Sequence, residues 1–184
     1  MAAIVETDMP LDRALLEQFR DQSGRNLAEL TDAQPQVVVF LRHSGCPFCR
    51  QAASDIAAQA EAIAATGAGI VLVHMMPETE AATFFGRFGV AQFPRISDPD
   101  QRLYEAFDLR NGTVWQLLGP KAWWEGAKSV LGRGQGVGWP TGNVLRLPGS
   151  FLVSRGRILK AYRSETSSDR PDYTAIAACE LPTR

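Results

Sequence analysis

The fold of this chain is decided by residues 37–50, VVVFLRHSGCPFCR. Residues 37–41 are continuously apolar, which is typical of a central strand that is covered on both faces. The residues after Cys46 follow a helical pattern with Pro47 in its first turn, where the missing N–H of proline costs nothing. Two cysteines separated by two residues therefore lie where a buried strand gives way to a helix.

The spacing of Cys46 and Cys49 suits a disulfide. Side chains at i and i+3 in a helical turn have Cβ atoms about 5–6 Å apart, and a small adjustment reaches the ~3.8 Å that a disulfide prefers. Cys46 is expected at the exposed helix N-terminus, where unpaired N–H groups and the helix dipole favour a thiolate. Cys49 is expected one turn further in and more covered. This asymmetry predicts an attacking Cys46 and a resolving Cys49.

Half of a zinc site is the main alternative for this motif. Structural zinc sites usually take four Cys or His ligands, whereas the chain has three Cys and two His. His43 and His74 are not spaced like a second ligand pair, and Cys179 is distant in sequence. A Cys-x-x-Cys motif beside a βαβ pattern is typical of thioredoxin-like redox chemistry. We therefore expect no metal and no cofactor, because the electrons would come from another dithiol.

Composition narrows the class of protein further. The 184 residues fit one domain, with 45% hydrophobic and 21% charged residues as in ordinary globular proteins. A net charge of −1 gives no sign of a nucleic-acid or membrane-surface binder. Residues 1–8 carry acidic groups and no long apolar core, and no stretch reaches the ~18 apolar residues of a membrane span. We expect a cytoplasmic protein with no nucleic-acid or membrane partner.

Periodicity and turn residues predict the remaining elements. Helices are expected over 10–22, 47–66, 77–88 and 103–107, in a stripe within 113–131, and after 171. Strands are expected over 37–41 and 70–74, with a short extended piece over 93–96 and a hairpin of 144–153 with 157–163. The glycine-rich residues 132–142 lack the Lys-Ser/Thr of a phosphate loop, and a surface loop is expected there. The prediction is a single domain over 1–184, made of an N-terminal helical extension (1–35) and a core (36–180).

Several segments, taken in order, resemble a known family. They are residues 38–50 (VVFLRHSGCPFCR), 93–99 (FPRISDP) with Leu103-Tyr104, 147–153 (LPGSFLV) and 169–171 (DRP). The set is similar to the peroxiredoxin-like branch of the alkyl hydroperoxide reductase/thiol-specific antioxidant superfamily, which includes selenoprotein L-type proteins. This resemblance implies an α/β, thioredoxin-like fold: a central mixed sheet flanked by helices, with a helical insertion before the C-terminal β-hairpin.

The sequence departs from this family around the cysteines. Peroxiredoxins place Thr or Ser three residues before the attacking cysteine and a proline further upstream. This chain has His43 at the first position and Val39 or its neighbours at the second. Arg42, His43 and Arg146 are candidates to stabilise a Cys46 thiolate, with a solvated charge as the alternative role of each. Pro148 stands before a hairpin strand, where thioredoxin-fold proteins often carry a cis-proline that faces the cysteines.

Together these features predict a thiol–disulfide redox protein. The partner is a thiol or disulfide protein, or a hydroperoxide, and disulfide exchange is expected to outpace the reduction of hydrogen peroxide. Two other functions stay open: a thiol peroxidase, and a non-enzymatic module that binds a metal or cluster through the same cysteines. The oligomeric state is also open, with a homodimer as one alternative.

Overall fold

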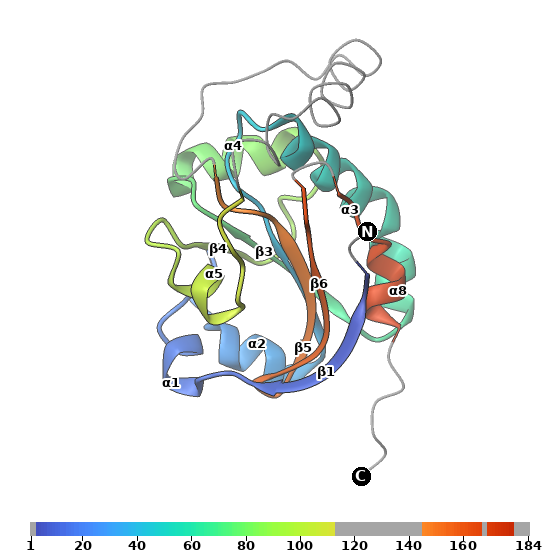
Figure 1. Ribbon diagram of the computed structural model, residues 1–184. Coiled ribbons are helices and arrows are strands. Elements are labelled where there is room, and N and C mark those ends of the chain that lie inside the picture. The colour runs from blue at the N-terminus through green and yellow to red at the C-terminus, as the bar shows by residue number, and fades with distance from the viewer. Residues whose placement is uncertain (1–2, 113–144, 167–168, 179–184) are drawn as a thin grey trace.

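The computed structural model describes residues 3–112, 145–166 and 169–178. Its strands form one mixed sheet in the order β1-β6-β5-β2-β3-β4 (Figure 1). The strands are β1 (Val5–Pro10), β2 (Gln36–Phe40), β3 (Gly69–His74), β4 (Arg95–Ser97), β5 (Gly149–Ser154) and β6 (Arg157–Arg163). The helices are α1 (Arg13–Leu16), α2 (Leu27–Ala33), α3 (Pro47–Ala65), α4 (Glu78–Arg87), α5 (Arg102–Ala106) and α8 (Tyr173–Ala177).

The strand directions confirm the mixed sheet. β2, β3 and β4 run parallel, as a strand–helix–strand connection requires. β5 pairs antiparallel with β2, and β6 pairs antiparallel with β5, so the chain returns as a hairpin. The expected helical insertion and the glycine-rich segment 132–142 lie outside the described residues.

The sheet is covered on both faces, and β2 supplies both cores. Val37 and Val39 point into a cluster with α3, α4 and α8, whereas Val38 and Phe40 point into a second cluster with α1, α2 and α5. Figure 1 shows α3 and α8 on one side of the sheet and α1, α2 and α5 on the other. The alternation explains why residues 37–41 are apolar without a break.

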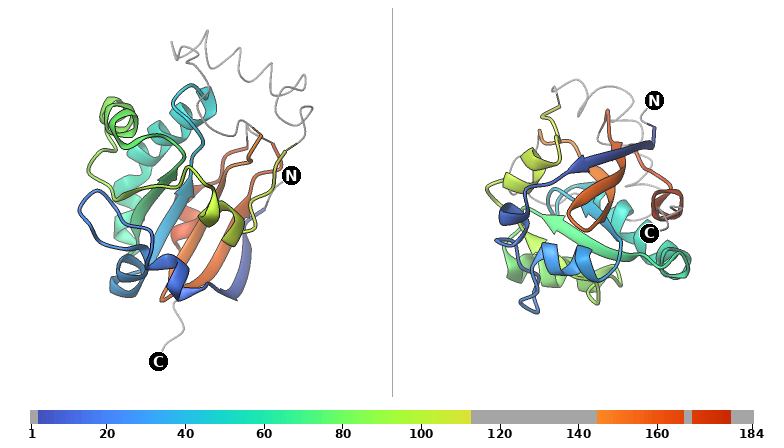
Figure 2. Two further views of the ribbon diagram at one scale, coloured as in Figure 1. Left: turned by 90° about the vertical axis from the view of Figure 1, so that its left-hand side faces the viewer. Right: turned by 90° about the horizontal axis from the view of Figure 1, so that it is seen from below.

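The N-terminal residues correct the prediction of a purely helical extension over 1–35. Residues Val5–Pro10 form β1, which pairs antiparallel with β6 and belongs to the same sheet as the core. Figure 2 shows β1, in dark blue, at the edge of the sheet. Almost the whole strand is exposed, so its sequence lacks the alternating apolar pattern that would reveal a strand.

The helix expected over 10–22 is also shorter than predicted. Asp12 caps α1 by accepting a hydrogen bond from the Ala14 amide (2.9 Å), but the helix ends at Leu16. Further on, the Asp21 carboxylate accepts hydrogen bonds from the amides of Ser23 (2.8 Å) and Arg25 (3.0 Å). Such local side-chain bonds compete with the helix and favour a turn.

Other boundaries agree with the sequence prediction. The chain leaves α3 through Gly67, whose φ of +83° is readily adopted only by glycine. The hairpin turn between β5 and β6 has positive φ at both Arg155 (49°) and Gly156 (69°), the conformation that tight hairpins prefer. None of the helices in the described segments combines the length and apolar character needed to cross a bilayer.

His74, at the end of β3, is a buried histidine whose protonation opposes folding. Its Nδ1 lies 3.1 Å from the Met76 carbonyl oxygen, and its ring centroid lies 5.4 Å from that of Phe85. Its Nε2 has no hydrogen-bond partner among the described residues. Burial lowers the pKa of His74 from 6.5 to about 4, so the folded protein holds the neutral ring well below neutral pH.

We expect the protein to lose stability on acidification because of His74. Between pH 6.5 and about 4, His74 is protonated in the unfolded chain but neutral in the folded chain. The free energy of unfolding therefore falls as the pH falls. The loss from pH 7 to pH 5 should be about 2 kcal/mol, measured by urea unfolding at both pH values. A His74→Gln variant, which cannot titrate, should lose less by that amount. Equal losses in the two proteins would contradict this assignment.

Candidate active site

The turn between β2 and α3 places the two cysteines at the carboxyl-terminal end of β2, a central strand of the sheet. Cys46 is the N-cap of α3, with Pro47 at the first helical position, as the sequence predicts. The parallel strands β2 and β3 end at the same edge, where sites in sheets of this kind are usually found. Cys49 lies in the first turn of α3, one turn behind Cys46.

Exposure does not separate the two cysteines, contrary to the expectation from sequence. Cys46 is 3% exposed and Cys49 is 4% exposed. The first turn of α3 packs into the core, so its N-terminus is not an open helix end. The asymmetry between the cysteines must therefore arise from their hydrogen bonds.

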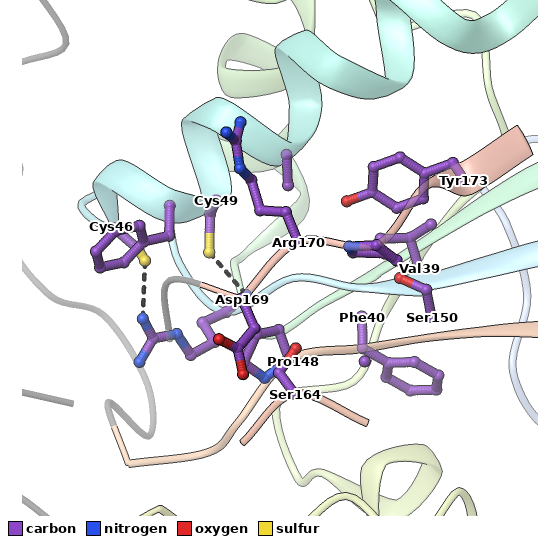
Figure 3. Close-up of a pocket in the computed structure, with 15 residues that line it drawn as sticks. Val39, Phe40, Cys46, Cys49, Pro148, Ser150, Ser164, Asp169, Arg170 and Tyr173 are labelled. Atoms are coloured by element: carbon purple, nitrogen blue, oxygen red, sulfur yellow. Dashed lines mark hydrogen bonds between the residues drawn. The ribbon is translucent and has the colours of Figure 1, made fainter. Parts of the chain in front are cut away.

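Arg42 contacts both sulfur atoms. Its guanidinium Nη2 donates a hydrogen bond to Cys46 Sγ at 2.9 Å, and its backbone N–H donates to Cys49 Sγ at 3.3 Å (Figure 3). Arg42 is itself only 5% exposed, so its charge acts on the sulfur with little screening by water. Of the three basic candidates from the sequence, Arg42 is the one whose side chain donates a hydrogen bond to Cys46 Sγ.

The surroundings of the two cysteines shift their pKa values in opposite directions. The Cys49 thiol donates to Cys46, and this bond, followed by the charge of Arg42, holds the pKa of Cys46 well below its ordinary value although burial opposes it. The same bond raises the pKa of Cys49 well above its ordinary value, and burial and the negative Cys46 act in the same direction. The arrangement therefore favours the thiolate at Cys46 and the thiol at Cys49.

His43 is buried beside the cysteines but contributes less than Arg42. Burial lowers its pKa, so the ring is neutral at neutral pH. Among the causes that lower the pKa of Cys46, His43 ranks below Cys49 and Arg42. Its Nδ1 is buried and has no hydrogen-bond partner among the described residues.

Arg146 lies elsewhere, and its candidacy from sequence is not supported. Its Nε donates to Gln101 Oε1 (2.8 Å), its Nη1 donates to the Leu109 carbonyl (2.6 Å), and its Nη2 lies 3.6 Å from Glu105. These bonds fix the guanidinium at α5 and the segment that follows it. Arg146 therefore holds two parts of the fold together rather than a thiolate.

Pro148 reaches the cysteines as the sequence suggests, but through a trans peptide bond. It lines a small cavity of about 20 Å³, room for about one water molecule, together with Cys46 and Cys49. Figure 3 shows this pocket between the start of α3, the start of β5 and the segment that leads into α8.

Other residues of the pocket were not assigned a role from sequence. Ser150 and Ser164 come from the hairpin and its end, and Asp169, Arg170 and Tyr173 come from the C-terminal segment. Arg170 binds Asp55 of α3 at 2.6 Å, which ties this segment to the helix that carries the cysteines. The family-like residues 169–171 are the only sequence signal for this wall.

The turn itself is held by polar side chains that sequence reasoning missed. The Ser44 hydroxyl donates to the Glu80 carboxylate of α4, and Arg50 Nε donates to the Ser44 carbonyl at 2.8 Å. Ser44 and Glu80 are far apart in the chain, so no local pattern could have paired them. These bonds fix the backbone that carries Arg42 and Cys46.

The alternative of a metal centre finds no ligand set in the described part of the chain. Within residues 3–112, 145–166 and 169–178, no three His, Cys, Asp or Glu side chains are grouped so that they could hold a metal ion. Cys179 lies outside the described residues. The chemistry that the described site can perform is that of a stabilised thiolate beside a second thiol.

A mixed sheet with helices on both faces and a cysteine pair at the β2–α3 turn defines a thioredoxin-fold protein. The chain belongs to the AhpC/TSA antioxidant enzyme family, whose sequence model matches residues 55–166. The match begins after both cysteines, so membership is carried by the body of the fold rather than by the Cys-x-x-Cys motif. The resemblance expected from sequence is thereby confirmed.

Comparisons with individual proteins agree with this membership. The chain is 28% identical over 172 residues to the thioredoxin-like protein AAED1, chloroplastic, of Arabidopsis thaliana, covering 83% of this chain and 65% of the relative. The chain thus spans slightly less than two thirds of that relative's length.

Solved structures show the fold. A Cys-to-Ser mutant of Xanthomonas campestris peroxiredoxin Q matches with a TM-score of 0.64 at 18% identity, covering 94% of this chain and 96% of that one. Peroxidoxin BcpB of Mycobacterium tuberculosis matches with a TM-score of 0.58 at 19% identity, covering 96% and 94% of the two chains.

Proposed function

We propose that the protein is a thiol-dependent oxidoreductase that cycles between a Cys46/Cys49 dithiol and a Cys46–Cys49 disulfide. One observation carries the proposal: the buried Arg42 guanidinium lies 2.9 Å from Cys46 Sγ, and Cys49 lies in the same first turn of α3. A thiolate is the attacking form of cysteine, and a neighbouring thiol is what resolution requires.

The proposed cycle oxidises the pair by two electrons. The Cys46 thiolate attacks one sulfur of a disulfide RSSR, forms the bond Cys46–S–S–R and releases RS⁻. Cys49 then loses its proton, attacks the Cys46 sulfur and releases the second RS⁻, which leaves the Cys46–Cys49 disulfide. A dithiol partner protein reverses the same exchange and restores both thiols. The cavity beside Pro148 borders both cysteines but holds only about one water molecule, so a substrate reaches Cys46 only when the residues around the cavity move apart.

Oxidised protein is expected to contain a Cys46–Cys49 disulfide. Trypsin cleaves after Arg42 and Arg50, so both cysteines fall in one peptide of residues 43–50. Mass spectrometry should find this peptide lighter by the mass of two hydrogens after oxidation, and restored by a reductant. A Cys179→Ala variant should behave identically. Finding Cys46 bonded only to Cys179 would refute the proposed pair.

Hydroperoxide reduction is a second candidate, and Arg42 favours it too. In that reaction Cys46 attacks the outer peroxide oxygen, the O–O bond breaks, and an alcohol leaves as the sulfenic acid forms. Cys49 then condenses with the sulfenic acid, giving the disulfide and water. The Arg42 guanidinium is a donor for the charge that develops on oxygen, although His43 stands where relatives carry a hydroxyl.

We expect disulfide exchange to be the faster of the two reactions. Exchange needs only a thiolate and a nearby thiol, whereas O–O cleavage needs preorganised donors on both oxygens, and one customary donor is replaced by His43. Stopped-flow mixing of reduced protein with hydrogen peroxide and with a small disulfide compares the two directly. A peroxide rate constant far above that of a free thiol at the same thiolate fraction would make the protein a peroxidase instead.

A further inference from the structure

We propose that Tyr104 is a positioning residue for the resolving cysteine. Its hydroxyl, on the opposite side of the sheet from the cysteines, holds and polarises the peptide group whose N–H donates to Cys49. This inference rests on the proposed cycle and assigns a residue to its second step. No sequence motif points to Tyr104 for this role.

A single peptide unit connects the tyrosine to the sulfur. The Tyr104 hydroxyl donates to the Leu41 carbonyl oxygen, and the N–H of the same peptide group, that of Arg42, donates to Cys49 Sγ at 3.3 Å. A hydrogen bond accepted by a carbonyl polarises its peptide group and strengthens the N–H as a donor. The hydrogen bond from Tyr104 on one face of the sheet therefore strengthens the N–H that donates to Cys49 Sγ on the other face.

The same hydroxyl fixes where this peptide group lies. It is 3.4 Å from the Val73 carbonyl oxygen, which also accepts the Leu41 N–H at 2.8 Å. The ends of β2 and β3 are thus joined at the residue before Arg42. The peptide group between Leu41 and Arg42 is thus held at its carbonyl by Tyr104 and through the neighbouring Leu41 N–H by β3, so that its own N–H points to Cys49 in one direction.

Tyr104 is itself held rigidly. Asp98 accepts hydrogen bonds from the amides of Arg102 (3.0 Å) and Leu103 (2.8 Å), which anchors the start of α5. The Tyr104 ring packs edge-on against Phe40 with centroids 4.8 Å apart. Burial raises the pKa of Tyr104 well above its ordinary value, so the hydroxyl stays a donor at physiological pH.

The chemical role belongs to resolution. When Cys49 attacks the Cys46 sulfur of a mixed disulfide, its proton leaves and negative charge develops on Cys49 Sγ until the new S–S bond forms and RS⁻ departs. The backbone N–H of Arg42 stabilises that developing charge, and the hydrogen bond from Tyr104 makes this N–H a better donor. The titratable and charged groups around Cys49 are Cys46 and Arg42 beside it, Asp169, Arg170 and Tyr173 in the same pocket, and Tyr104 on the other face of the sheet.

A Tyr104→Phe variant tests this, because it removes the hydroxyl and keeps the ring. Reduced protein is mixed with dithiobis(nitrobenzoate), which releases one coloured thiolate when Cys46 attacks and a second when Cys49 resolves. The variant should leave the first phase unchanged and slow the second about two- to fivefold, the size expected for weakening one charge-assisted hydrogen bond. The midpoint of the second phase against pH should move upward.

Tyr162→Phe is the matched control. Tyr162 is also buried, but its hydroxyl makes no hydrogen bond to the described residues, and it does not line the pocket that contains Cys46 and Cys49. It should leave both phases unchanged. A Tyr104→Phe protein in which neither phase changes, or both slow together, would overturn the inference. Wild-type protein without a Cys49-dependent second phase would refute the cycle itself, and with it this role.

Discussion

Replacing Arg42 with methionine is expected to raise the pKa of Cys46 by about one to two units. The side chain keeps its apolar stem but loses the charge and the hydrogen bond to Cys46 Sγ, and a charge-assisted bond of this kind contributes about 1.5–3 kcal/mol. The measurement is the rate of alkylation by iodoacetamide against pH. Its midpoint should move upward, with slower reaction at neutral pH and undiminished reaction at high pH.

Arg146→Met is the control that separates the two arginines. Arg146 is similarly buried but bonds to Gln101 and Leu109, so its loss should leave the midpoint in place even where it lowers stability. An equal shift in both variants would mean that general loosening, not a specific bond, controls the thiolate. Since stabilising the thiolate favours the dithiol, Arg42→Met should also lower the reduction potential of the pair.

Serine variants of the two cysteines should behave in opposite ways. Cys46→Ser should reduce turnover at least about a thousandfold, because no attacking sulfur remains. Cys49→Ser should keep the first attack and stop afterwards, so that a mixed disulfide on Cys46 accumulates. Gel mobility and intact-mass measurements after a short exposure to a disulfide distinguish these outcomes. The reverse pattern would show that Cys49 attacks and Cys46 resolves.

A Cys49→Ala variant refines that comparison. Serine retains a hydroxyl that can donate to Cys46 in place of the thiol, whereas alanine cannot, and this bond is the main cause of the low pKa of Cys46. The alkylation midpoint should therefore lie higher in Cys49→Ala than in Cys49→Ser. Equal midpoints would assign the thiolate to Arg42 alone.

Local signals were sufficient where a residue's neighbours in sequence are also its neighbours in space. Residues 37–41 needed no more than their unbroken apolar character to be placed as a central strand. Pro47 and the i, i+3 spacing placed the cysteines in the first turn of α3. Short turns such as 154–156 are likewise decided by the backbone preferences of a few adjacent residues.

The sequence by itself thus determined the strand–turn–helix unit and the place of Cys46 and Cys49 in it, and it predicted that Cys46 attacks and Cys49 resolves. The tertiary structure decided what produces that asymmetry: both sulfurs are buried, and Arg42 rather than Arg146 supplies the charge. It also decided that residues 5–10 close the sheet as β1. Hydrogen bonds between segments distant in the chain leave no periodic trace in sequence, because they depend on where the packed sheet brings each side chain.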